Sequence, residues 1–201
     1  MKKGLLIGGA VIGVILLFII IVGIWSVGTY NKMVTQNERV LQTWAQVENQ
    51  YQRRTDLIPN LVNTVKGYAN FEKDVLTKVT EARASVTSIK ATPELINDPQ
   101  AFRKFQEAQA NLGGALSRLM VTVENYPNLK ANEGFLNLQA QLEGTENRIT
   151  VARKSFNDEV QTFNTMIKRF PAFIFAGMSG FREKEYFKAV AGSETAPKVE
   201  F

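Results

Sequence analysis

The N-terminal part of the sequence is an unbroken apolar run, and beyond it apolar residues recur with helical spacing. No charged residue lies between Gly4 and Asn31, and residues 4–25 are all glycine, alanine or larger apolar residues. Because a helix rises about 1.5 Å per residue, a hydrocarbon core of about 30 Å takes roughly 20 apolar residues to cross. The run therefore predicts a transmembrane helix over residues 5–27, after a stub at residues 1–4. Its apolar positions include Leu5, Ile7, Val11, Leu16, Phe18, Ile21 and Trp25.

A cleaved signal peptide is the competing interpretation of this run, because Lys2 and Lys3 precede it. A signal peptide has an apolar core of about 7 to 15 residues that ends at a small-x-small site. The run at residues 4–25 is longer and leads to Ser26-Val27-Gly28, so its length favours an uncleaved anchor. Orientation stays open, because the lysines and arginines on the two sides of the span nearly balance.

The glycines of the anchor have two interpretations. Gly4 and Gly8, and again Gly9 and Gly13, are four residues apart. Small faces of this kind let two transmembrane helices approach closely, so they are candidate positions for packing between anchors. Simple tolerance of glycine in a spanning helix explains the same spacing about as well.

A first heptad pattern follows the anchor, with steps that alternate between three and four residues. Its members are Val40, Trp44, Val47, Tyr51, Arg54, Ile58, Leu61, Val65, Tyr68, Glu72, Val75, Val79, Ala82, Val86 and Ile89. Such a repeat is typical of coiled-coil-like bundles and predicts one long helix from about Asn31 to Thr87, kinked at Pro59. A new helix capped by Asp56, with Pro59 in its first turn, is the alternative. The charged members, Arg54 and Glu72, are expected to reach water from the seam rather than to fix register or partner.

Two further long helices are predicted downstream, connected by turns that contain proline. Thr92-Pro93 starts a short connector helix and Asp98-Pro99 a second long helix, which Pro127 ends. The second long helix has a heptad seam with one polar member, Gln109; its members are Phe102, Phe105, Gln109, Leu112, Leu116, Leu119, Val123 and Tyr126. A third opens near Asn132 and ends before Pro171. The fold class is therefore all-α, an elongated antiparallel helical bundle over residues 30–170 behind a transmembrane helix. Within the second helix Gly113-Gly114 is expected to mark a close helix contact rather than a hinge.

The last segment, residues 171–201, is rich in aromatic residues. Its candidate interaction residues are Phe173, Phe175, Phe181, Tyr186 and Phe187. They could lie in the bilayer interface or on a neighbouring subunit, but covering the end of the bundle is the favoured interpretation, because exposed aromatic patches are rare. The residues from Gly192 to Phe201 are expected to be loose.

Composition excludes several chemistries. The chain of 201 residues carries 24 lysines and arginines against 19 acidic residues, a net charge of +5 that gives no concentrated field for nucleic acid. It has no cysteine and no histidine, which removes thiol nucleophiles, Ser-His-Asp triads and the usual zinc ligands. Glu143 and Glu146 are expected to be solvated surface charge. We expect no enzyme activity, no metal, no cofactor and no small-molecule substrate.

Several phrases of the sequence resemble the bacterial LemA family. They are Gln52-Arg53-Arg54-Thr55-Asp56-Leu57-Ile58-Pro59-Asn60-Leu61-Val62, Thr64-Val65-Lys66-Gly67-Tyr68-Ala69, Glu124-Asn125-Tyr126-Pro127-Asn128-Leu129-Lys130-Ala131 and Glu143-Gly144-Thr145-Glu146-Asn147-Arg148-Ile149. The resemblance implies a single-pass protein of the bacterial cytoplasmic membrane with a helical domain and no established catalytic activity. Where the family often has His-Glu, this chain has Phe71-Glu72, so no role of that histidine transfers.

These patterns together lead to two hypotheses about function. The first is a non-enzymatic, membrane-anchored scaffold that self-associates as a homo-oligomer and holds or regulates another envelope protein. The resemblance adds a membrane protease as a candidate partner, because members of the family can be encoded near such proteases. The second is a solitary membrane-anchored module that grips a lipid or a peptide with its aromatic tail.

Overall fold

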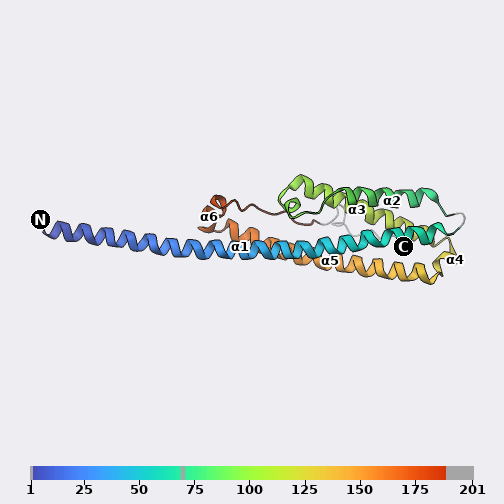
Figure 1. The fold of residues 1–201 in the computed structure, drawn as a ribbon, viewed down its shortest axis with the longest axis horizontal. Coiled ribbons are helices and arrows are strands. Elements are labelled where there is room, and N and C mark those ends of the chain that lie inside the picture. Colours follow the sequence, from blue (N-terminus) through green and yellow to red (C-terminus); the bar gives the residue numbers. More distant parts are fainter. Residues whose placement is uncertain (1, 69–70, 189–201) are drawn as a thin grey trace, which may run out of the picture.

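The protein is all-helical in the computed structural model, which describes residues 2–68 and 71–188, with side chains from residue 8 onward (Figure 1). The predicted loose segment from Gly192 lies outside the described residues, as do the side chains of Leu5 and Ile7 and the surroundings of Gly4. The predicted fold class, a long apolar N-terminal helix followed by an antiparallel bundle, is confirmed. The elements are α1 (Lys2–Lys66), α2 (Lys73–Ser88), the 3₁₀ helix η1 (Pro93–Asn97), α3 (Pro99–Val123), α4 (Pro127–Lys130), α5 (Glu133–Lys168) and α6 (Ala172–Met178).

Helix α1 contains both the apolar run and the first helical segment of the bundle, without interruption. It is the one described helix that is long and apolar enough to cross a membrane. Its side chains from Val11 to Ile24 are exposed, whereas the heptad positions from Val40 to Val65 are all buried. The N-terminal third therefore extends beyond the bundle as a free apolar rod (Figure 1).

The single helix predicted from Asn31 to Thr87 is wrong. Helix α1 ends at Lys66, the chain reverses, and α2 returns alongside it, so the bundle has four long helices rather than three (Figure 1). The heptad spacing continues across the reversal because both helices bury an apolar face in the same core. Glu72 consequently occupies the exposed N-cap position of α2 rather than a seam.

Pro59 lies inside α1, and the predicted alternative of a new helix capped by Asp56 is wrong. A proline at position 59 cannot donate a backbone hydrogen bond to the carbonyl of Thr55. That carbonyl instead accepts a hydrogen bond from Nε of Arg83 on α2, at 3.1 Å. The bond that the proline removes from α1 is thus replaced by one that joins α2 to α1.

The four long helices form two antiparallel pairs, α1 with α5 and α2 with α3, stacked along the bundle (Figure 1). Their buried side chains form two clusters. The cluster nearer the apolar rod surrounds Trp44, whose ring lies 5.5 to 6.2 Å from the rings of Phe102, Phe105, Phe156 and Phe187. The other fills the far end of the bundle with aliphatic side chains of α1, α2 and α3.

Two helix starts follow the sequence closely. Oδ1 of Asp98 accepts hydrogen bonds from the amides of Gln100 and Ala101, and Oδ1 of Asn132 accepts one from the amide of Phe135. Each satisfies amide groups that the first turn of a helix leaves free. These caps fix where α3 and α5 begin. The connector predicted after Thr92 is η1.

Candidate functional site

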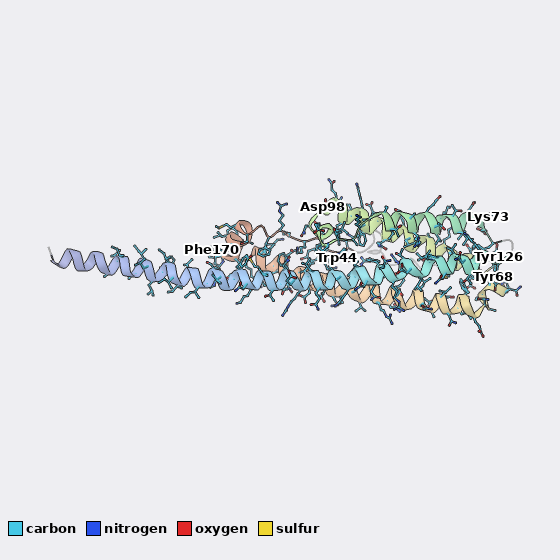
Figure 2. The ribbon with its side chains drawn as sticks, viewed as in Figure 1. Trp44, Tyr68, Lys73, Asp98, Tyr126 and Phe170 are labelled. Atoms are coloured by element: carbon cyan, nitrogen blue, oxygen red, sulfur yellow. The ribbon has the colours of Figure 1, made fainter. Side chains whose placement is uncertain are left out.

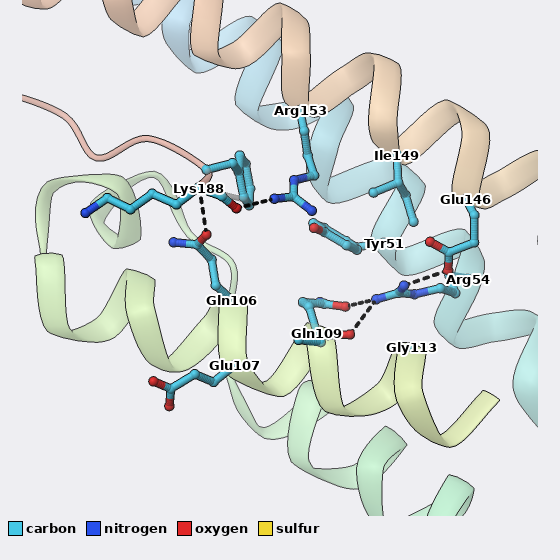
Figure 3. Close-up of a pocket in the computed structure, with 12 residues that line it drawn as sticks. Tyr51, Arg54, Gln106, Glu107, Gln109, Gly113, Glu146, Ile149, Arg153 and Lys188 are labelled. Carbon is cyan, nitrogen blue, oxygen red and sulfur yellow. Dashed lines mark hydrogen bonds and ion pairs between the residues drawn. The ribbon is translucent and has the colours of Figure 1, made fainter. Parts of the chain in front are cut away.

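A buried polar cluster interrupts the core halfway along the bundle (Figure 3). Its centre is Arg54 of α1, which is only 3% exposed, so the expectation that this side chain reaches water is wrong. Nη1 of Arg54 donates to Oε1 of Glu146 on α5 at 2.6 Å, and Nη2 donates to the side-chain oxygen of Gln109 on α3. The cluster therefore joins three helices through one guanidinium group.

The partner of Arg54 on α3 is itself an exception in its helix. Gln109 is the one polar member of the α3 heptad seam, and it is 6% exposed. An arginine in one seam and a glutamine in another meet because the two seams face the same core. Burying a guanidinium is costly unless its hydrogens are bonded, and these two partners supply most of the bonds. Nε of Arg54 remains buried with no described partner.

An open cleft of about 530 Å³ lies beside this cluster (Figure 3). Helices α1, α3 and α5 and the end of the described tail supply its walls. The residues that line it are Tyr51, Arg54, Gln106, Glu107, Gln109, Ala110, Gly113, Glu146, Ile149, Arg153, Phe187 and Lys188. Three of these side chains carry positive charge and two carry negative charge, so the cleft combines an apolar floor with a small excess of cations.

Gly113 explains part of the opening. Apart from the adjacent residues and the backbone of α3 itself, no atom lies within 4 Å of the position that a Cβ would take at Gly113 or at Gly114, so the predicted close helix contact is wrong. Gly113 instead lines both this cleft and a second one of about 520 Å³, which extends along α3 and α5 as far as Gln139 and Glu143. Glu146 lines both clefts as well. The two clefts therefore adjoin at Gly113 and Glu146.

Two cations and a phenol set the electrostatics of the first cleft. The guanidinium of Arg54 lies over the ring of Tyr51, 5.1 Å from its centroid. Burial raises the pKa of the Tyr51 phenol, while the positive charges of Arg153 and Arg54 oppose that rise. Glu146 keeps 47% of its side chain exposed, so it can face both Arg54 and solvent. The Tyr51 phenol therefore stays neutral near pH 7 beside two permanent cations.

The tail closes one end of the cleft (Figure 3). Arg153 of α5 lies over the ring of Phe187, 4.6 Å from its centroid, and its Nη2 donates to the carbonyl of Lys188 at 3.1 Å. The Lys188 amide donates to Oε1 of Gln106 on α3 at 3.2 Å. The tail is thus bound from both sides of the cleft.

Two asparagines of α5 hold the tail through its backbone. Asn157 accepts from the amide of Phe187 and donates to its carbonyl, both at 2.9 Å. Asn164, one heptad later, makes the same pair of bonds with Lys184, at 3.0 and 2.9 Å. Because these contacts involve only backbone atoms, they hold an extended segment whatever its side chains.

Lys184 is a tail residue with a largely buried ammonium group. Its Nζ donates to Oδ1 of Asn97 at 2.9 Å and lies 5.1 Å from the ring centroid of Phe163. Burial lowers the pKa of its ammonium group. A lysine in this place adds an anchor for the tail on η1.

The aromatic residues of the tail divide into two groups. Phe187 is buried against Trp44, Phe102 and Phe156, while Phe181 and Tyr186 are half-buried against the same cluster. Phe175 contacts Trp25, and Phe173 is exposed. The tail therefore packs along the side of its own bundle, and α6 alone presents apolar side chains outward.

The remaining positions of the resemblance serve different parts of the fold. Among the described side chains Arg53, Asp56, Asn60, Lys66 and Pro127 are exposed, and Leu57, Pro59, Tyr68 and Tyr126 are half-buried. Tyr126 packs its ring 5.0 Å from Phe71 at the far end of the bundle, and Pro127 begins α4. Of these signature positions, Arg54 is the one that lines the cleft.

Sequence reasoning missed Arg153, Asn157 and Asn164. A signal was present: Asn157 and Asn164 each follow a seam phenylalanine, Phe156 or Phe163, seven residues apart. A repeated amide beside a seam indicates that something polar lies along that helix. Glu146 was expected as surface charge and instead pairs with Arg54, while Glu143 is exposed as expected.

The chemistry available in the cleft suits binding. Guanidinium groups bind carboxylates through paired hydrogen bonds, and the aromatic and aliphatic floor can bury an apolar side chain. Among the described residues, no group of three histidine, cysteine, aspartate or glutamate side chains is placed to hold a metal ion.

Comparisons with known proteins agree on one family. The chain is 29% identical to magnetosome protein MamQ of Magnetospirillum gryphiswaldense and 27% identical to MamQ 2 of Paramagnetospirillum magneticum, each over 83% of this chain and 67% of the relative. It is 24% identical to protein LemA of Metamycoplasma hominis, over 78% of this chain and 68% of the relative. The LemA family model matches residues 43–201, which include every helix of the bundle beyond the first part of α1. The chain belongs to the LemA family.

Proposed function

We propose that this protein is a non-enzymatic, membrane-anchored adaptor that holds an acidic segment of another envelope protein in the cleft between α3 and α5. The observation that carries the proposal is that two arginines, the buried Arg54 and the half-buried Arg153, line one open cleft with Tyr51 between them (Figure 3). Carboxylates are the natural partners of such guanidinium groups. The proposal places the chain in the bacterial cytoplasmic membrane, held by the apolar part of α1.

The rigid link between anchor and cleft supports an adaptor role. Helix α1 continues from the apolar run to Lys66 without a break, and Arg54 is one of its residues. A segment bound in the cleft that Arg54 lines would therefore be held at a fixed distance from the bilayer, about 44 Å beyond Trp25 at 1.5 Å per residue. A membrane protease is a candidate partner, because a protein of that kind works at a defined height above the same bilayer.

The alternative of a solitary module that grips with its aromatic tail has less support. Phe187 is buried in the core, and the side chains of Asn157 and Asn164 are hydrogen-bonded to the backbone of the tail. The aromatic tail would have to break these contacts and leave the bundle before it could bind a ligand. The cleft needs no such rearrangement.

Site-specific photo-crosslinking in the membranes of the native host tests the proposal. A photoreactive residue in place of Glu107, which lines the cleft, should give a discrete adduct with another protein. The same residue in place of Val151, exposed on α5 and outside the clefts, serves as the matched control. Arg153→Gln should reduce the adduct at position 107, because it removes a cation from the cleft. Equal labelling at positions 107 and 151, or a yield that Arg153→Gln leaves unchanged, would contradict the proposal.

A further inference from the structure

A patch of exposed apolar side chains surrounds α6 and is used by neither the core nor the cleft. Phe170 and Met178 are each 81% exposed, Phe173 is 51% exposed and Ile174 is 45% exposed. We call these four residues the α6 patch. Beyond the apolar run, the other exposed large apolar side chains of the described chain are scattered: Tyr30, Val121, Leu136 and Val151. Four such side chains within nine residues mark an interaction surface.

The orientation of α6 explains why the patch points outward. Ala172 and Ala176, one turn apart, are buried against the bundle. Side chains four residues apart share a helix face, so the small face of α6 packs inward and the large residues are left outside. The helix is amphipathic in the reverse of the usual sense for a surface helix, with its bulkiest apolar groups toward solvent.

The patch lies at the level where the apolar run of α1 ends. Phe175 of α6 contacts Trp25, the last residue of that run, with ring centroids 5.6 Å apart. Tryptophan is enriched at the boundary between hydrocarbon and headgroups, and Trp25 stands at that boundary if the run spans the membrane. Figure 2 shows Phe170 at the end of the bundle from which the free part of α1 projects.

Basic side chains surround this level of the structure. Lys32 and Arg169 line a groove with Trp25 and Thr29, just beyond the apolar run. Lys168 also lies there and pairs with Glu183 at 2.7 Å. Cations immediately outside an apolar surface suit the phosphates of lipid headgroups. The apolar patch and these cations are therefore arranged in the order of a bilayer surface, with hydrocarbon first and headgroups next.

We infer that the α6 patch is a second membrane contact, which inserts into the bilayer interface beside the transmembrane part of α1. The occupant of the patch is lipid, because the patch adjoins the end of the apolar run and continues its surface. With two contacts, the bundle cannot rotate freely about α1, so the cleft faces a fixed direction relative to the membrane. This contact is independent of what the cleft binds.

The absence of cysteine from the chain makes a direct test simple. Single variants Phe173→Cys and Met178→Cys of the full chain are labelled with an environment-sensitive fluorophore and reconstituted into vesicles of phosphatidylcholine and phosphatidylglycerol. Ile24→Cys in the apolar run and Val151→Cys on the far part of α5 give the two reference positions. The quenchers are brominated lipids and aqueous iodide.

Labels at positions 173 and 178 should lose fluorescence to brominated lipid to nearly the extent of the label at position 24, and should be protected from iodide. Quenching by iodide alone, as at position 151, would show that the patch faces water and would overturn the inference. Protection from both quenchers would mean that a second copy covers the patch, which also overturns it. Circular dichroism confirms that each variant keeps its helix content, and two positions guard against one that misfolds.

Discussion

Arg54 is a permanently charged side chain held almost entirely out of water. Its guanidinium is bonded to Glu146 and Gln109 and lies over Tyr51. Buried ion pairs contribute little net stability when intact, because the cost of desolvating the charges offsets their mutual attraction. Removing one partner is nevertheless costly. Stability measurements can therefore distinguish a bonded cluster from an isolated buried charge.

Replacing Arg54 should destabilise the bundle. Arg54→Met keeps a long side chain but leaves Gln109 buried without its partner, which costs about 1–3 kcal/mol. Arg53→Met is the matched control, since that neighbouring arginine is exposed and should be replaceable with little effect. Denaturant unfolding of the detergent-solubilised chain, followed by circular dichroism, measures both. Equal losses in the two variants would contradict the assigned cluster.

A double variant separates the free energy lost by leaving Gln109 unpaired from the net contribution of the cluster to stability. In Arg54→Met with Gln109→Leu no buried polar group is left unpaired, and Glu146 remains half in solvent. The double variant should recover most of the stability that Arg54→Met loses. A recovery of that kind would indicate that the cluster is kept for binding rather than for stability.

Tyr51 gives the bundle a dependence on alkaline pH. Burial raises the pKa of its phenol above the ordinary value of 10.0. Above that value the unfolded chain loses the phenolic proton while the folded chain keeps it, so rising pH favours unfolding. Between pH 9 and pH 11 the wild-type chain should lose more unfolding free energy than Tyr51→Phe. Parallel pH curves for the two proteins would show that the phenol is not buried as described.

At the scale of helices, the pattern of apolar residues predicted the class of fold and most helix ends. Prolines and capping residues identified the starts of η1, α3 and α5, because those signals act within one turn. The reversal after Lys66 escaped prediction, because the heptad spacing continued through it and residues 67–72 contain a single glycine. Periodicity describes which face is buried but carries no information on chain direction.

The cleft was predictable only in fragments. Arg54 and Gln109 were visible as polar members of two seams, but which helices pair decides whether such residues meet. The repeated asparagines, Asn157 and Asn164, indicate a polar partner along α5, but they do not identify it as the tail, since a backbone partner leaves no pattern in the side chains of the tail. Contacts between distant segments depend on tertiary packing that a single sequence does not reveal.

The contact between α1 and α2 at Pro59 is testable by a double-mutant cycle. Arg83→Met removes the donor to the Thr55 carbonyl and should destabilise the wild-type chain by about 1–2 kcal/mol. In the Pro59→Ala background the restored backbone amide bonds that carbonyl, so Arg83→Met should cost clearly less. Lys78→Met, on an exposed face of α2, should cost the same in both backgrounds. Denaturant unfolding of the four chains gives the coupling energy.

The asparagine pair makes a prediction about the tail as an element. Asn157→Ala with Asn164→Ala removes the acceptors for the amides of Lys184 and Phe187, which should then exchange with solvent faster. Hydrogen exchange with mass spectrometry on peptides spanning residues 181–188 measures this, and Asn137→Ala, exposed on α5, is the control. Unchanged exchange in the double variant would mean that the core contacts of Phe187 suffice.

For the whole molecule, the structure changes where self-association would occur. The heptad seam of α1 is filled within one chain, mainly by α5, so it offers no face to a second bundle. The anchor remains open, because apart from the adjacent residues and the backbone of α1 itself nothing lies within 4 Å of the Cβ positions of Gly8, Gly9 and Gly13. The anchor is therefore the candidate surface for pairing of chains.

The solubilised particle should have several times the mass of one chain, as measured by light scattering in detergent. Gly9→Leu with Gly13→Leu should reduce that mass, because larger side chains hold two anchors apart. Ile15→Leu, which changes shape without adding volume in the same apolar run, should leave it unchanged. A wild-type chain that is monomeric at working concentration would exclude the self-associating scaffold.

The continuity of α1 also gives the molecule a mechanical property. The helix extends about 60 Å from Trp25 to Lys66, at 1.5 Å per residue, and is continuous through Pro59. A lever of that length converts a tilt of about 10° in the membrane into a sideways displacement of about 10 Å at the α4 end. Because a thinner bilayer tilts a spanning helix further, a change in membrane thickness would displace the far end of the bundle sideways.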